Sequence, residues 1–484
     1  MDGVALKNSC KVISLLGIFF AFFLMLAVGV GFFYNESIFA FALFDAGLFI
    51  FSLLGYLLLR KHEVKMRIKD AILTVNLIWI LLGVVGAMPF VLSTGVGFTD
   101  GFFEAISGFT TTGATIYINI EDLPKHILLL RSLMHWLGGL GIIVLGVGLL
   151  SLINPTGSMA LFKAESTGTK LDKFTPKIKD TATKIWGIYL LLTLADMLLL
   201  WLEGMSLFDA LNHAFSTMST GGFSTKNNSM AYWAQQPIIL WTTTLFMLLA
   251  GINFLAHIRM MRGDISGYYV EEVRWYFTIF VGLSLALAYV YMGVSGVSFS
   301  ESFTHASFTV ASILTTTGFV SADYGQWGSM ATVLVFIAML VGGNAGSTAG
   351  GFKISRVVVM LKNIALQVRK LLHPKAIMGL YVDGNEVSHD TLGIISGFAF
   401  LFILSNMILT GYLYAAGYDL MTSLSAAVAM VGNIGPGFAR VGAVENYHFF
   451  TSVDKLVMSF FMIMGRLEFY TVVILLSRSF WKKF

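Results

Sequence analysis

Nine segments of the chain are each about 20 residues long and carry few or no charged side chains. A helix rises ~1.5 Å per residue, so ~20 residues cross the ~30 Å hydrocarbon core of a bilayer. With 56% hydrophobic and only 12% charged residues, the chain could not bury its apolar surface in a soluble core. The sequence therefore predicts an all-α integral membrane protein. The nine segments are 12–33, 38–59, 71–92, 132–153, 185–202, 237–257, 275–294, 391–416 and 456–477.

A tenth span is expected at 330–341, where glycines interrupt the apolar run before a basic segment begins at Phe352. About ten transmembrane helices result, and an even number places both ends of the chain on one side. Lys7, Lys11 and the basic segments fall on that side, and they hold 25 of the 31 Lys and Arg residues. By the positive-inside rule, both termini are expected to be cytoplasmic. These basic segments are 60–69, 163–184, 259–274, 353–375 and 478–483.

The N-terminal run has no obvious cleavage site, so it is expected to be a membrane anchor and not a removed signal peptide. The single cysteine, Cys10, excludes an internal disulfide framework, and no Cys/His spacing of a metal site occurs. Nothing in the sequence pairs a nucleophile with a base or forms a phosphate-binding loop, so no enzyme activity is expected. Nucleic-acid binding is not expected either.

Four polar segments between the spans share one pattern. Each has a short apolar stretch of about two to three helical turns, followed by Thr or Ser and then Gly. Three of the four have Ser six residues before this glycine, and the fourth has Ala429. The pattern predicts four pseudo-symmetric helix–pore-loop–helix repeats, with residues 1–70 as an extra N-terminal helix pair. The segments are DGFFEAISGFTTTGAT (100–115), DALNHAFSTMSTGGFS (209–224), HASFTVASILTTTGFV (305–320) and TSLSAAVAMVGNIGPG (422–437).

The four runs around these glycines can be interpreted in two ways. One Thr-Thr-Thr-Gly run alone is more often an extracellular turn whose hydroxyls bind backbone groups. Non-helical backbone at membrane depth, however, is tolerated only where it lines water or is buried in protein. Glycine permits positive φ, which can turn carbonyl oxygens inward to replace the hydration shell of a cation. Four copies at matching offsets favour a pore, which is pseudo-fourfold because the runs TTGA, TGGF, TTGF and NIGP differ.

Longer motifs carry a specific resemblance over essentially the whole chain. They are FTTTGAT (109–115), MHWLGGLGIIVL (134–145), KAESTG…KFTPKI (163–178), STGGFST (219–225), LTTTGF (314–319), GGNAGSTAGGFK (342–353), GNIGPG (432–437) and GRLE (465–468). With these motifs the chain resembles the Trk/Ktr/HKT superfamily of potassium transporters, and most of all the bacterial TrkH-type pore subunits. The extra first helix pair is similar to the TrkH type and differs from the Ktr type.

The resemblance implies potassium uptake across a bacterial inner membrane, with K⁺ as the transported ion and no organic cofactor in this chain. It also implies a homodimer with one pore per subunit, gated by a cytosolic TrkA-type ring of nucleotide-binding subunits. The repeats would then occupy residues 71–183, 184–274, 275–375 and 376–484. Asn433 and Ile434 replace the Thr pair of other repeats. The residues that this resemblance assigns to the filter are Thr111, Thr112, Gly113, Thr220, Gly221, Gly222, Thr316, Thr317, Gly318, Asn433, Ile434 and Gly435.

Two further features are candidates for gating. Arg466 lies in the last span, where a charged side chain needs a water-filled cavity or a partner. Glu468 is two residues away on the same helix and cannot face it, so Arg466 is expected near the pore axis below the filter. The segment 341–353 is too rich in glycine for a continuous helix, and its resemblance to an intramembrane gating loop favours a gate over a simple kink. Its glycines are Gly342, Gly343, Gly346, Gly350 and Gly351.

Asp45 and Asp196 lie in otherwise apolar spans. We expect hydrogen-bonded structural carboxylates there more than ligands of a coupling ion. His135 and His257 are expected to be packed or interfacial residues. Two other functions stay open, a secondary transporter of Na⁺ or an organic solute and a receptor without transport. Four repeats of one orientation disfavour the first, which usually has inverted or twofold repeats. The sequence does not distinguish channel-like flux from H⁺- or Na⁺-coupled flux.

Overall fold

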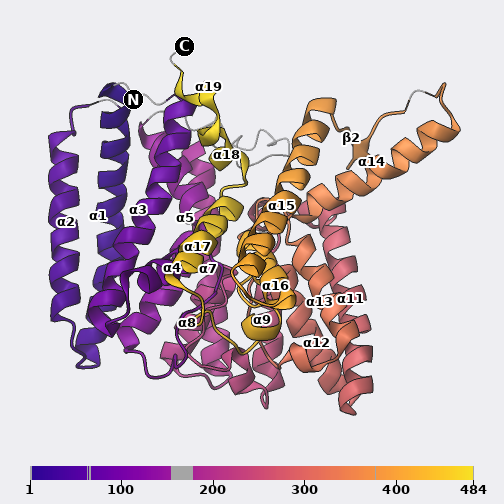
Figure 1. The fold of residues 1–484 in the computed structure, drawn as a ribbon, viewed down its shortest axis with the longest axis horizontal. Helices are drawn as coiled ribbons and strands as arrows, with labels where there is room; N and C mark the ends of the chain where they lie inside the picture. Colours follow the sequence, from indigo (N-terminus) through magenta and orange to yellow (C-terminus); the bar gives the residue numbers. More distant parts are fainter. Residues whose placement is uncertain (1–2, 63, 65–66, 154–177, 377, 483–484) are drawn as a thin grey trace.

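The computed structural model describes residues 3–62, 64, 67–153, 178–376 and 378–482. This part of the chain is helical apart from its turns, loops and one small antiparallel sheet. In that sheet β1 (Tyr381–Val382) pairs with β2 (Asn385–Glu386), with Tyr381 opposite Glu386. The two ends of the chain lie at the same end of the molecule (Figure 1).

The extra N-terminal helix pair forms one edge of the molecule (Figure 1). Helix α1 (Gly3–Phe33) packs along α2 (Phe39–Leu58), and small residues allow this close contact. A side-chain carbon on Gly17 would lie only 2.3 Å from the Ser52 hydroxyl. The turn between the two helices carries Glu36, whose carboxylate accepts from the first backbone amides of the helix that starts at Lys125. The pair is thereby attached to the rest of the protein.

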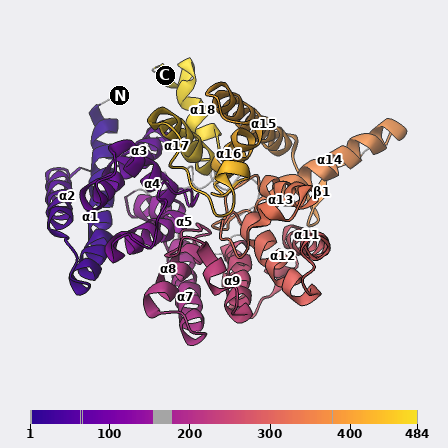
Figure 2. The same cartoon turned by 60° about the horizontal axis from the view of Figure 1, so that its bottom comes forward.

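The remainder of the chain repeats one order of elements four times: a long helix, a short helix, a loop and a closing helix. The long helices are α3 (Ile68–Thr94), α7 (Ile178–Leu202), α11 (Glu271–Ser295) and α15 (His389–Ala415). The short helices are α4 (Phe98–Phe109), α8 (Leu207–Met218), α12 (Phe299–Leu314) and α16 (Leu420–Gly432). Figure 2 shows the four units around a common centre, in chain order.

The closing helices differ more from one another. As far as the structure describes the closing segments, α5 (Lys125–Ile153) is one continuous helix, whereas the other three are interrupted. Helix α9 (Pro237–Ala250) bends by 99° into α10 (Phe254–Met260), and α17 (Ser452–Arg466) bends by 117° into α18 (Tyr470–Leu476). Helix α13 (Ser329–Val341) is followed by a glycine-rich loop (342–353) and by α14 (Ile354–Leu372), which projects from the body in both views (Figures 1 and 2).

Short single-turn elements complete the described chain. They are the 3₁₀ turns η1 (Ser229–Trp233), η2 (Ser266–Tyr268), η3 (Tyr324–Gln326) and η4 (Ala439–Val441), and the last helix α19 (Arg478–Trp481). The long helices α3 and α11 both end at a glycine in the left-handed conformation, Gly95 (φ 72°) and Gly296 (φ 67°). Glycine adopts this conformation without steric cost, which explains where these helices stop.

The predicted fold class is confirmed: the protein is an all-α membrane protein with four helix–loop–helix repeats. Within the described residues, six single helices are long and apolar enough to cross a membrane, and the two bent pairs raise this number to eight. The two other expected spans coincide with α5 and with the shorter apolar helix α13.

Candidate functional site

Each of the four short helices ends in the same unusual backbone turn. The second residue of each turn has positive φ, and a glycine with positive φ follows two residues later. Such a conformation costs about 1–3 kcal/mol in a β-branched residue such as Thr, whereas Asn tolerates it better. Three of the four repeats nevertheless place Thr there. The φ angles are 54° at Thr111, 54° at Thr220, 58° at Thr316 and 53° at Asn433, then 80° at Gly113, 84° at Gly222, 83° at Gly318 and 96° at Gly435.

One backbone hydrogen bond per repeat holds this turn against its short helix. The amide of the residue before the glycine donates to the carbonyl of the residue six positions before that glycine. This is the position at which the sequence pattern has Ser107, Ser216, Ser312 and Ala429. Because the carbonyl is the common acceptor, alanine can replace serine in the fourth repeat. The four N···O distances are 2.9 Å from Thr112, 2.8 Å from Gly221, 2.7 Å from Thr317 and 2.9 Å from Ile434.

The four loops close into a ring, in which the glycine of each repeat lies against a carbonyl oxygen of the next repeat. We call the carbonyl groups of Thr112, Gly221, Thr317 and Ile434 the carbonyl ring. The contacts are so close that a single added carbon would meet each oxygen well inside van der Waals distance. Such a carbon would lie 2.2 Å from Gly221 O on Gly113, 2.0 Å from Thr317 O on Gly222, 2.2 Å from Ile434 O on Gly318 and 2.5 Å from Thr112 O on Gly435.

A second layer of contacts joins the same four repeats just beyond the carbonyl ring. The Ile120 amide donates to Asn227, which joins repeats 1 and 2. The Ala231 amide donates to Val320 O (2.9 Å), the Tyr324 hydroxyl to Gly437 O (3.1 Å) and the Tyr447 amide to Thr115 O (2.8 Å). These bonds join repeats 2 and 3, 3 and 4, and 4 and 1. The loops are therefore closed on themselves twice.

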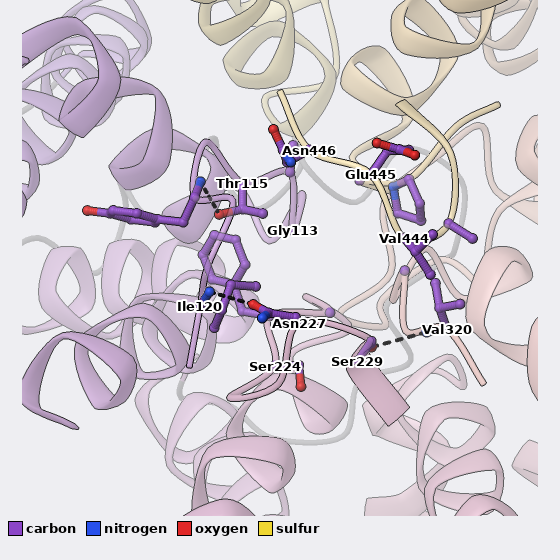
Figure 3. A pocket seen from close by; sticks show the side chains of 18 of the residues that line it. Gly113, Thr115, Ile120, Ser224, Asn227, Ser229, Val320, Val444, Glu445 and Asn446 are labelled. Carbon is purple, nitrogen blue, oxygen red and sulfur yellow. Dashed lines mark hydrogen bonds between the residues drawn. The ribbon is translucent and has the colours of Figure 1, made fainter. Parts of the chain in front are cut away.

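A cavity opens onto the glycine side of the carbonyl ring (Figure 3). All four loop glycines line it, together with residues that follow them, and the Ile120–Asn227 contact lies in its wall. Glu445 and Asn446, from the loop before α17, lie at the side opposite Asn227 in this view. The cavity thus leads from outside the loops to the centre of the four repeats.

Several features of the ring favour a cation. The short helices all end at the ring, and a helix C-terminus carries a partial negative charge. The hydroxyl oxygen of Thr111 and the amide oxygen of Asn433, at matching positions, are buried without a hydrogen-bond partner in the described chain. Both are oxygen atoms that a hard cation could use as ligands. Next to them, the side-chain amide nitrogen of Asn433 donates to the Thr112 hydroxyl (3.0 Å), and this bond joins repeats 4 and 1.

A buried ion pair supports the first loop from behind. Arg131 Nε of α5 donates to Glu104 of α4 at 2.8 Å, and both side chains are almost completely buried. The Thr115 hydroxyl donates to the same carboxylate (2.9 Å). In the second repeat, His213 and Ser224 occupy the matching positions and are 2.9 Å apart. Sequence reasoning did not select these residues, although a charged residue inside an otherwise uncharged segment was a usable signal.

The glycine-rich loop (342–353) lies directly against the other side of the ring. The Gly350 amide donates to the Thr316 hydroxyl (2.7 Å), and a side-chain carbon on Gly350 would lie 2.6 Å from Gly432 O. The Thr348 hydroxyl is within hydrogen-bonding distance of Met218 O (3.1 Å). The loop therefore contacts the ends of the short helices or the turns that follow them in repeats 2, 3 and 4.

Arg466 is the last residue of α17 and bridges this loop to α5. Its guanidinium donates to Thr348 O and to Gly138 O and Gly139 O, each at 3.0 Å. Glu468 lies beyond the end of α17, in the break before α18. It binds Arg356 at 2.6 Å and Lys353 at 3.2 Å.

The remaining polar residues of the spans are buried but differ in their contacts. His257 is bound to Tyr268 and to Leu249 O, as a packed residue should be. Oδ1 of Asp45 has no hydrogen-bond partner within the described residues, and neither oxygen of Asp196 has one, although the Thr217 side chain lies close to Asp196. No cluster of metal-binding side chains occurs among those residues either. Most of the basic loop 163–184 lies outside the described residues, which omit 154–177.

Comparison with known proteins decides the family. The sequence profile of the TrkH family, described as a cation transport protein, matches residues 38–483. This chain belongs to the TrkH family. A relative from Vibrio parahaemolyticus, named Trk system potassium uptake protein TrkH, is 36% identical over 433 residues, which cover 87% of this chain and 88% of that protein.

Other TrkH family members match to a similar extent. The Trk system potassium uptake protein TrkH of Escherichia coli K12 is 34% identical over 88% of both chains. The Trk system potassium uptake protein TrkI of Halomonas elongata is 35% identical over 84% of this chain and 83% of that one. The crystal structure of the potassium transporter TrkH from Vibrio parahaemolyticus superimposes with a TM-score of 0.87 at 31% identity, and the match covers 100% of both chains.

Proposed function

We propose that this protein takes up potassium through a selectivity filter formed by the carbonyl ring. The observation that carries the proposal is the closed ring of four carbonyl groups, each packed against the glycine of the preceding repeat. Rings of backbone carbonyls can replace the hydration shell of a permeating cation. The names of the relatives, which are potassium uptake proteins, support K⁺ as that cation.

The filter residues in this proposal are those assigned from the sequence. The four pore repeats comprise residues 71–183, 184–274, 275–375 and 376–484. Thr111, Thr220, Thr316 and Asn433 would form the inner layer and the carbonyl ring the next one. The strained turn is maintained in all four repeats, although the sequences differ. Strain of this kind persists where the surrounding structure determines it and function uses it.

The glycine-rich loop is proposed as the gate. Arg466 would hold this loop in its closed position and would also repel permeating cations electrostatically. Arg466 contacts both the loop, at Thr348, and α5. A guanidinium stays charged at any working pH, and it lies on the side of the ring that the glycine-rich loop covers. Opening would require the loop to leave Thr316 and Met218, together with release or movement of Arg466.

We further propose that the protein lies in a bacterial inner membrane with both termini cytoplasmic, as a homodimer. A cytosolic ring of nucleotide-binding subunits would bind the basic segments and control the gate. Helix α14 supports this, because it projects from the body and belongs to the basic segment 353–375 (Figure 1). It also exposes apolar side chains, among them Leu361, Leu371 and Leu372, and leads directly out of the glycine-rich loop.

Flux in proteoliposomes tests the proposal. Potassium and rubidium uptake should exceed sodium uptake, and measurements with and without a pH or Na⁺ gradient separate a channel from a coupled transporter. Saturable uptake of an organic solute, or no ion flux under any condition with the regulatory partner present, would contradict the proposal.

A further inference from the structure

The second repeat lacks a side chain that the other three repeats have. In the residue that contributes to the carbonyl ring, repeats 1, 3 and 4 have Thr112, Thr317 and Ile434, whereas repeat 2 has Gly221. In repeats 1 and 3, this threonine hydroxyl lies 2.7 Å from the hydroxyl two residues earlier and braces the loop. In repeat 2 this brace cannot exist, because Gly221 has no side chain.

An imidazole from another repeat fills this space. A side-chain carbon built on Gly221 would lie 1.7 Å from Nδ1 of His135, so the ring occupies the place of the missing side chain. His135 belongs to α5, which closes repeat 1, and it is completely buried. Its ring stacks on Phe223, two residues after Gly221, with 4.1 Å between the centroids and 20° between the planes.

The contacts of His135 are packing contacts. Neither ring nitrogen has a hydrogen-bond partner within the part of the chain that the structure describes. The position of the ring is fixed by the helix itself. One turn later, a carbon on Gly138 would lie 1.9 Å from Phe109 O, and one on Gly139 would lie 2.8 Å from the Ser219 Cα. Helix α5 is therefore pressed against the ends of two short helices, which holds His135 behind the second loop.

We propose that His135 is a filter-positioning residue, whose ring does in repeat 2 what the side chains of Thr112 and Thr317 do in their own repeats. The ring holds the Gly221 carbonyl in the carbonyl ring and thereby sets discrimination between K⁺ and Na⁺. This inference rests on the proposed filter. It also explains why Gly221 is glycine, since any other residue would displace the imidazole.

The test compares His135→Ala, His135→Phe, Gly221→Thr and the double variant Gly221→Thr/His135→Ala. Each full-length protein is expressed in cells that lack their own potassium uptake systems, and K⁺ and Na⁺ uptake are measured. His135→Ala should lower the K⁺/Na⁺ uptake ratio about tenfold, which corresponds to about 1.4 kcal/mol. His135→Phe should keep the ratio, because a flat ring still fills the space and neither nitrogen is hydrogen-bonded to a described residue.

Gly221→Thr alone should abolish uptake, and removal of the imidazole in the double variant should restore at least a tenth of the wild-type rate. Leu130→Ala removes another buried side chain from α5 and serves as the control for general damage to the helix. A wild-type ratio in folded His135→Ala, a loss in His135→Phe equal to that in His135→Ala, or no recovery in the double variant would overturn the inference. Failure of the filter proposal looks different, because then the wild type itself shows no preference for K⁺.

Discussion

Gly113 gives the sharpest test of the carbonyl ring. Replacement by alanine has two effects that the structure separates. Alanine at φ 80° is strained, which costs about 1–2 kcal/mol. In addition, its Cβ would lie 2.2 Å from Gly221 O, and because Cβ contacts below 3.0 Å essentially never occur, that oxygen or the first loop must move by at least 0.8 Å.

Gly263 provides the matched control. Its φ of 82° is almost the same, but no atom lies within 4 Å of a Cβ built on it. Gly263→Ala therefore carries the backbone strain alone. Both variants should lose a similar amount of thermal stability from this strain, whereas only Gly113→Ala should change the arrangement of the ion ligands.

Uptake of K⁺ and Na⁺ by proteoliposomes, with thermal unfolding of the purified variants, measures both effects. We expect the K⁺/Na⁺ ratio to fall about tenfold or more in Gly113→Ala, which corresponds to about 1.4 kcal/mol, and to stay unchanged in Gly263→Ala. The series should follow the distances, with Gly222→Ala (2.0 Å) most affected and Gly435→Ala (2.5 Å) least affected. An unchanged ratio in folded Gly113→Ala would refute the carbonyl ring as the selectivity filter.

Three further predictions concern the gate and the N-terminal pair. Arg466→Ala should raise potassium flux several-fold without a change in selectivity. Arg466→Lys should show an intermediate flux, because it keeps the charge but cannot span all three carbonyl groups. Lower flux in folded Arg466→Ala would make the residue structural. Thr348→Val removes the hydroxyl that approaches Met218 O and should raise basal flux, and a wild-type flux would argue against a gating loop. Burial raises the pKa of Glu36, but hydrogen bonds from the His126 ring and the amides of α5 outweigh it and hold the pKa below 4.5. The carboxylate therefore stabilises the fold above about pH 4.5 and loses this effect as the pH falls further. Glu36→Gln should lower the free energy of unfolding by about 1 kcal/mol at pH 7 and by much less at pH 3. An equal loss at both pH values in thermal unfolding would contradict this.

The spans and the four repeats could be predicted because their signals are local. Apolar runs of span length, the glycines and the Thr-Gly turns each lie within one stretch of sequence. What could not be predicted are contacts between distant residues. Glu104 and Arg131 lie on different elements, and so do Gly221 and His135. Nothing near Gly221 in the sequence indicates that the His135 ring fills the space beside it. The order in which the loops close on one another depends on the packing of whole helices.

The same limit applies to Asp196, which is buried and whose oxygens have no hydrogen-bond partner in the described part of the chain. Hydropathy showed that this carboxyl lies inside a span, but not which groups the neighbouring helices place around it. The nearby Thr217 hydroxyl donates to its own helix, to His213 O at 2.7 Å. Serine and threonine hydroxyls often bind the carbonyl four residues earlier, and such local competition is decided only when the helices pack.

The construction of the carbonyl ring from a single polypeptide has a consequence for how the proposed filter can change over generations. In a channel assembled from four identical subunits, one codon change alters every quarter of the ring at once, so a mildly damaging substitution acts four times. Here one substitution alters one quarter, and the other three preserve the ion path while a second change compensates. Gly221 and His135 have the form of such a pair, since the space beside Gly221 is filled by a side chain from the neighbouring repeat. Substitutions can therefore accumulate separately in each repeat. The sequences around Asn433 and Gly221 differ in this way, although the backbone angles of the two turns agree.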